Sequence, residues 1–109
     1  MVVQFILKGL HNVTNGAYNN IGMKIIPKGF TAWKGVVYGN DTGNTHRWYS
    51  SSISLGTSDT ATDSTENIGT IKTFDDEVVG DGATYVTVVV DSDTNDDIYG
   101  GAIYIKRTT

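Results

Sequence analysis

The chain has 109 residues, enough for one domain, and it contains no cysteine, which excludes disulfide bonds and zinc-thiolate sites. Its formal net charge is −4, and no run of basic residues is suited to follow a phosphate backbone, which argues against nucleic-acid binding. No apolar stretch is long enough to span a membrane and no secretory signal pattern opens the chain, so we expect no membrane partner and synthesis in the cytoplasm.

Short β-rich runs separated by Gly, Asn and Asp fill the chain, and no run of ten or more residues repeats apolar positions at helical spacing. Strands are expected at residues 2–10, 21–26, 30–38, 48–55, 68–74, 83–90 and 102–107. Parallel strands need crossover helices, so these strands should pair antiparallel. The sequence therefore predicts an all-β fold, an antiparallel two-sheet β-sandwich that is jelly-roll-like, with seven to eight strands in a single domain, 1–109.

The inward residues of several strands can be predicted from the period-two alternation of a pleated sheet. Ile53 and Leu55 should face the core in one strand, and Ile103 and Ile105 in the last. The strand at 30–38 is less regular, because neither of its two faces is purely apolar, and Gly35 there predicts a bulge or a bend. Pro27 ends the strand before it, and the glycine two residues later suits a turn.

Polar segments separate these strands, and we expect loops or turns at 11–16, 39–45, 56–67 and 91–97. Residues 75–77, which are all acidic, predict a solvated corner, since adjacent carboxylates point in different directions and do not make a catalytic pair. Residues 56–67 favour an ordered surface loop. The alternative is one short helical turn capped by Ser58 or Asp59.

The best metal candidate is the set Asp91, Asp93 and Asn95, whose alternate spacing matches the opening of a calcium loop. The match then stops, since Asp96 stands where the motif needs glycine and Ala102 where it needs glutamate. A hydrophilic loop between two strands is the favoured interpretation. We therefore predict no cofactor and no metal, with these three residues as a weak calcium candidate.

No catalytic constellation is visible in the sequence. His11 and His46 are the only histidines, and both fall in expected loops. The serines at 50–52 lie near His46 in the chain, but a nucleophile also needs an orienting carboxylate, and no Gly-x-Ser-x-Gly elbow is present. We therefore expect a protein that is not an enzyme.

Aromatic side chains are the best candidates for an interface or a ligand contact: Trp33, Trp48, Tyr49, Tyr85 and Tyr104. Trp48 and Tyr49 are neighbours in one strand and point to opposite faces, so at least one of the two rings should be exposed or at a contact. A subunit interface is favoured over a sugar-stacking platform, because aromatic residues are enriched at the centres of interfaces.

Four segments together resemble small virion proteins encoded among tailed-phage head genes: residues 25–30 (IIPKGF), 53–59 (ISLGTSD), 85–90 (YVTVVV) and 100–105 (GGAIYI). The resemblance spans about residues 20–107 of the chain. It implies a capsid decoration (cement) or head-fibre protein on a jelly-roll scaffold, located on the capsid surface of the virion and often trimeric. The implied partners are further copies of the chain and the major capsid protein.

Two expectations accompany this resemblance. Residues 1–9 would be an N-terminal strand, or an arm that pairs with a neighbouring subunit or the shell. The alternative function is a carbohydrate-binding module or a receptor-binding fibre tip, which would use Trp33, Trp48 and Tyr49.

Overall fold

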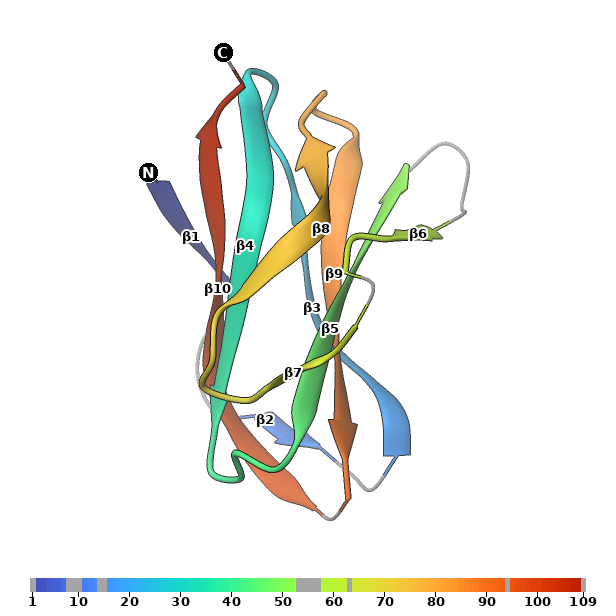
Figure 1. Cartoon of the computed structure of the whole chain (residues 1–109), viewed down its shortest axis with the longest axis vertical. Coiled ribbons are helices and arrows are strands. Elements are labelled where there is room, and N and C mark those ends of the chain that lie inside the picture. Colours follow the sequence, from blue (N-terminus) through green and yellow to red (C-terminus); the bar gives the residue numbers. More distant parts are fainter. Residues whose placement is uncertain are drawn as a thin grey trace.

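The computed structural model of the protein describes residues 2–7, 11–13, 16–52, 58–62, 64–93 and 95–108. These residues form ten strands (Figure 1). The strands are β1 (Val2–Leu7), β2 (His11–Val13), β3 (Gly16–Ile25), β4 (Phe30–Gly39), β5 (Thr45–Ser52), β6 (Ser58–Thr60), β7 (Glu66–Asn67), β8 (Lys72–Val79), β9 (Thr84–Ser92) and β10 (Asp96–Arg107). Among the described residues there is no helix of the length and apolarity that a membrane span needs.

The strands form two antiparallel sheets that pack as a sandwich. The first sheet has the order β1-β10-β4-β8, with β2 also paired to β10, and the second has the order β3-β9-β5-β6, with β7 also paired to β5. Three strands, β2, β6 and β7, have only two or three residues. Of the seven longer strands described, four lie in the first sheet and three in the second, which confirms the predicted all-β sandwich.

The pairing of the strands is nested. The two sheet orders contain eight strands when β2 and β7 are left out. Numbered in chain order, the first of these eight pairs with the last (β1–β10), the second with the seventh (β3–β9), the third with the sixth (β4–β8) and the fourth with the fifth (β5–β6). One long antiparallel hairpin wound around a core produces this order, which is that of a jelly roll. The backbone of residues 2–7 belongs to this arrangement, since β1 pairs with β10 of the same chain.

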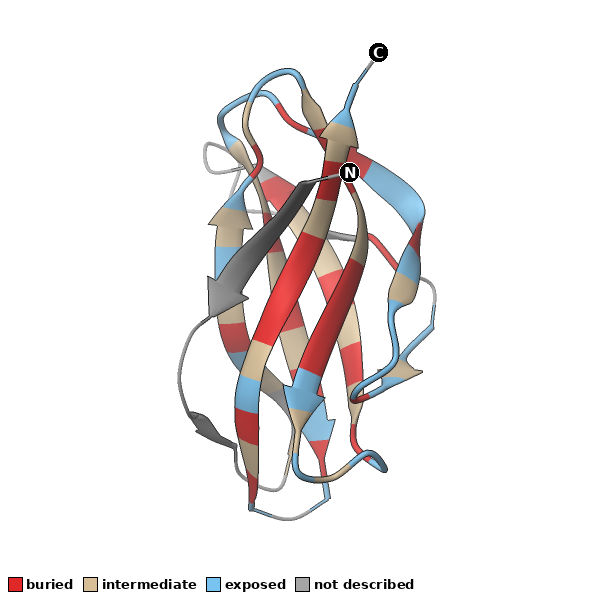
Figure 2. Cartoon of the chain, turned by 90° about the vertical axis from the view of Figure 1, so that its left-hand side faces the viewer, coloured by how far each residue is buried: buried red, intermediate tan, exposed pale blue. Residues whose placement is uncertain are grey.

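The core lies between the sheets, and alternation along the strands fills it. Val86, Val88 and Val90 of β9 are buried while the residues between them are partly exposed. Figure 2 shows buried and less buried bands following one another along the strands. Ile103 and Ile105 of β10 are buried as expected. The buried cluster consists of Ile21, Ile26, Ala32, Val37, Trp48, Ala61, Ile68, Phe74, Val78, Val86, Val88, Val90, Ile98, Ile103 and Ile105.

The irregularity predicted in β4 is present, but it lies at Trp33. The pairing with β10 skips Trp33, so this residue is an extra one in the strand. Gly35 has a different role. A Cβ at this position would lie 2.8 Å from Cη2 of Trp48, and closer still to two other ring atoms, so Gly35 leaves the space that the Trp48 indole occupies. The turn before β4 is as expected, with Gly29 at φ 91° and the Phe30 amide donating to the Pro27 carbonyl over 3.2 Å.

Several expected boundaries are wrong. The strand predicted at 68–74 is instead β8, which begins at Lys72 and runs through the three acidic residues at 75–77. Those three are exposed, as a solvated corner would be, but water can solvate carboxylates equally well on a strand at the edge of a sheet. Similarly, β9 and β10 extend into the acidic segment 91–97 from both sides, since the outward residues there face water.

Several residues that were expected in loops lie in strands. His11 lies in β2 and His46 in β5, so neither is in a loop. The segment 56–67 contains β6 and β7 and is neither a continuous loop nor a capped helical turn among its described residues. Pairing with neighbouring strands, which local sequence does not reveal, orders these residues. Ile53 and Leu55 lie outside the described residues.

Candidate functional site

The five aromatic residues singled out in the sequence lie in three different places. Trp48 is in the core. Trp33 and Tyr104 lie on the outer face of the first sheet, where Tyr104 pairs with Lys34. Tyr49 and Tyr85 lie on the outer face of the second sheet. The platform expected from Trp33, Trp48 and Tyr49 is therefore not formed.

Trp48 is fully buried, so its predicted contact with a partner or ligand is wrong. Its indole Nε1–H donates to Nδ1 of His46 over 2.8 Å, and the two rings meet edge to face with centroids 6.0 Å apart. The Phe74 ring lies 5.6 Å from the Trp48 ring. Trp48 faces inward because it pairs with Val88 on β9, a strand whose even-numbered residues all face the core. The local sequence does not show which of the two neighbours, Trp48 or Tyr49, faces inward.

The outer face of the first sheet is covered by its own charged side chains. The Nζ atoms of Lys34 and Lys106 lie 4.1 Å and 4.9 Å from the centroid of the Trp33 ring. Lys106 also forms an ion pair of 2.7 Å with Glu77. Val36, at an outward position, is nevertheless fully buried. The part of this face around Trp33 is thus covered by lysine stems and the indole, and the Trp33 Nε1 beneath them is buried without a hydrogen-bond partner among the described residues. Elsewhere on the same face Tyr38 and Val79 are 46% and 57% exposed.

The outer face of the second sheet is different, because it is mostly uncharged and open. Two cross-strand rows define it, in which Met23, Thr87 and Tyr49 are paired in one row and Ile25 and Tyr85 in the next. Paired residues project to the same side of a sheet. The Met23 side chain is 55% exposed and that of Ile25 is 39% exposed. We call the outward residues of β3, β9 and β5 the second-sheet face: Asn20, Met23, Ile25, Thr45, Arg47, Tyr49, Ser51, Tyr85, Thr87, Val89 and Asp91.

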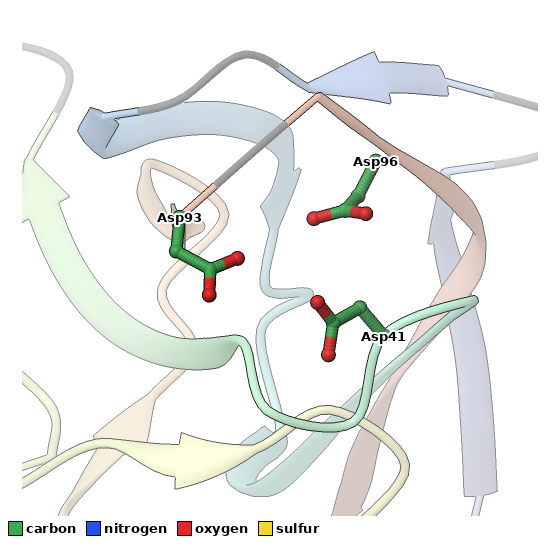
Figure 3. Close-up of side chains that lie close together, drawn as sticks. All are labelled: Asp41, Asp93 and Asp96. Atoms are coloured by element: carbon green, nitrogen blue, oxygen red, sulfur yellow. The ribbon is translucent and has the colours of Figure 1, made fainter.

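A third feature is a cluster of carboxylates at the end of the sandwich where β4 leads into β5 and β9 into β10. One carboxylate oxygen from each of Asp41, Asp93 and Asp96 lies within 4.8 Å of the others, and Figure 3 shows the three side chains converging. The Asp96 carboxylate is buried, and it accepts hydrogen bonds from Asn44 Nδ2 at 2.8 Å and Ser92 Oγ at 3.0 Å.

The residues of this cluster differ from the calcium candidates predicted from sequence spacing. Of the three residues in that set, only Asp93 belongs to the cluster, while Asp91 and Asn95 are exposed and lie outside it. Three carboxylate oxygens at this separation have the ligand chemistry of a hard cation. Sequence spacing missed Asp41, because it lies about fifty residues away in the chain and only the fold brings it close.

His46 is not placed to act as a base for the serines at 50–52. Its Nδ1 accepts the Trp48 hydrogen bond and its Nε2 lies 3.0 Å from the Thr70 carbonyl oxygen, so both ring nitrogens are occupied. Burial holds the pKa of His46 below its usual range. A Ser–His pair at this histidine is therefore not formed.

No protein-family model, no curated protein and no solved structure matches this chain.

Proposed function

We propose that this protein is a non-catalytic structural module that binds other protein subunits through the second-sheet face. The observation that carries the proposal is the exposure of Met23 and Ile25 beside two tyrosines on a sheet face that is otherwise almost uncharged. Of the residues on this face, only Arg47 and Asp91 carry a charge. Exposed apolar surface with few charges is typical of a contact surface.

The composition of the face fits the centre of an interface. Tyr, Met and Arg are enriched at the buried centres of interfaces, whereas Lys, Glu and Asp are depleted there. Arg47 lies with its guanidinium carbon 5.7 Å from the Tyr49 ring centroid, which gives a planar donor beside a flat aromatic surface. The residues stand on hydrogen-bonded strands, so little backbone freedom would be lost on binding.

The identity of the assembly rests on the resemblance to phage virion proteins. We propose that the chain decorates and stabilises a tailed-phage capsid, with further copies of itself, as a homotrimer, and the major capsid protein as partners. Jelly rolls are frequent in viral capsid and lectin domains, which agrees with this proposal by analogy of fold only.

Sedimentation velocity with the wild-type chain and the variant Ile25→Lys tests the proposal. The wild type should sediment as an oligomer of the 11.8-kDa chain, a trimer in the proposed form, whereas the variant should remain folded but shift to the monomer. Ile71→Lys is a matched control, because Ile71 is 45% exposed but lies between β7 and β8, away from this face. Its oligomeric state should be unchanged.

The capsid role has a separate readout. Shells assembled from the major capsid protein encoded with this gene should co-sediment the wild type and the Ile71→Lys control, and should retain less of Ile25→Lys. A monomeric wild type that also fails to bind these shells would contradict the proposal.

A second candidate function is glycan binding on the same face. Tyr49 pairs with Thr87 and Tyr85 pairs with Ser51, so the two tyrosines are diagonal neighbours whose rings could both stack on a sugar. Trp33 is on the opposite sheet and Trp48 is buried, so tryptophan fluorescence would not report such binding. A glycan array probed with wild type and Tyr85→Ala separates the two functions, because only glycan binding predicts wild-type signals that the variant loses.

A further inference from the structure

The segment from Ala61 to Ile71 closes one side of the sandwich. Its backbone binds the second sheet where the Ala61 amide donates to the Trp48 carbonyl over 3.0 Å, and Ile68 to Asn44 over 2.9 Å. It binds the first sheet where the Gly69 amide donates to the Val37 carbonyl over 2.7 Å. Figure 1 shows this yellow-green segment, which contains β7, crossing from β5 towards the start of β8. We call its described residues, 61–62 and 64–71, the crossing segment.

His46 ties the crossing segment to β5. It pairs with Glu66 of β7, and its side chain reaches the Thr70 carbonyl. An indole N–H can only donate, so the 2.8-Å bond from Trp48 Nε1 requires an unprotonated Nδ1 on His46. The ring proton must then sit on Nε2, which donates to Thr70. The geometry accommodates only the neutral ring with this one tautomer.

Protonation of His46 would leave the Nε2–H donor to the Thr70 carbonyl in place, but it would break the bond between Nδ1 and Trp48. It would place an N–H on Nδ1 facing the N–H of Trp48, and it would put a positive charge on a fully buried side chain. Water can reach this charge only if the groups that cover the ring move, and the crossing segment is the part of that cover that lies outside the two main sheets. The charged groups that act on the ring are Glu66 of β7, which favours protonation, and Lys72 of β8, which opposes it. On the remaining neighbouring strand, β9, the paired residue is Val90, which carries no charge.

We propose that His46 is an acid-sensitive latch, whose protonation releases the crossing segment from β5 and opens this side of the sandwich while the rest of the jelly roll stays folded. Opening would uncover apolar groups that are now buried, among them Ile68 and Trp48. The latch does not involve the second-sheet face, so it is independent of the proposed function. It would make contacts on this side of the molecule dependent on pH in the range below 6.5, the ordinary pKa of histidine.

Hydrogen exchange at about pH 7.5 and about pH 5, corrected for the pH dependence of intrinsic exchange, tests the latch. The amides of Ile68 and Gly69 should lose protection in acid, whereas amides of the β3–β9 ladder, such as that of Val88, should keep theirs. Unchanged protection of Gly69, or an equal loss in both regions, would overturn the proposal, because the second result would be ordinary acid unfolding.

Two variants connect the response to His46. His46→Gln cannot become charged, so the loss of Gly69 protection should disappear, while His11→Gln, at the only other histidine of the chain, should leave it unchanged. Glu66→Gln removes the carboxylate that favours protonation and should move the response to lower pH without disturbing the core. This variant keeps the proposal testable if His46→Gln does not fold. A response at unchanged pH in Glu66→Gln would count against the latch.

Discussion

The identity and position of several residues in this protein are explained by one neighbour that is close in space but not adjacent in the chain. Gly35 is small because the Trp48 indole lies against its Cα, and Trp48 in turn is held by His46. None of these three residues is next to another in the chain. Trp48, one of the five aromatic residues expected at an interface or a ligand contact, therefore lies in the core.

Gly35→Ala tests this packing. The added methyl group must displace the Trp48 ring or bend β4, so we expect a loss of stability of about 1–3 kcal/mol, as in other overpacked cores. The free energy of unfolding in urea, followed by tryptophan fluorescence, measures it. Gly16→Ala is the matched control. It lies in β3 with no heavy atom within 4 Å of the added Cβ, and its change should stay below about 1 kcal/mol. A Gly35→Ala variant as stable as the control would contradict the packing argument.

Strands and turns are set by pairing partners as much as by local composition. Strand β8 is ordered through three adjacent acidic residues because it is the last strand of its sheet, where those side chains reach water. Charged residues on an edge strand also oppose pairing with other chains. The turn that follows, between β8 and β9, depends on one carboxylate. Asp81 accepts hydrogen bonds from the amides of Ala83 at 2.8 Å and Thr84 at 2.6 Å.

Asp81→Ala should lower stability at neutral pH, and the difference from the wild type should vanish in acid. The two backbone hydrogen bonds hold the pKa of Asp81 below its ordinary value of 3.8. A carboxyl group with a lowered pKa in the folded state stabilises above its unfolded pKa and loses this contribution as pH falls through the folded pKa. Urea unfolding midpoints of both proteins between about pH 7 and pH 2 measure the effect. A difference that stays constant over this range would rule out the charged hydrogen bonds as its cause.

At the scale of the whole molecule, the nested strand order makes most pairings distant in sequence. β1 pairs with β10 and β3 with β9, so the ends of the chain must meet before the sandwich closes. The same order brings the β4–β5 loop beside the β9–β10 turn, which gathers Asp41 with Asp93 and Asp96. It also makes two unlike outer faces: lysines surround Trp33 on the first, and the second exposes Met23 and Ile25 among mostly uncharged residues.

Refolding should accordingly be slow for a domain of 109 residues. Two-state proteins dominated by non-local pairing fold on the order of milliseconds to seconds, because the chain loses the entropy of closing long loops before the stabilising contacts form. Stopped-flow dilution from urea, with Trp48 as a buried reporter of core formation, measures the rate. Refolding within microseconds would contradict a nested pairing order.

The sequence by itself determined the class of fold. Runs such as 85–90, which are β-branched almost throughout, and the absence of helical spacing predict antiparallel strands, and alternation placed Ile103 and Ile105 correctly in the core. These features are local, since they depend on residues a few positions apart.

Only the tertiary structure decided which polar and aromatic residues act together. It placed Trp48 in the core, His46 in a strand with both ring nitrogens bound, and Asp41 beside Asp93. Alternation shows that neighbouring residues face opposite sides of a strand, but it does not show which side another sheet will cover. That choice depends on how two sheets, built from distant segments, come together, and it fixes both the candidate site and the open face.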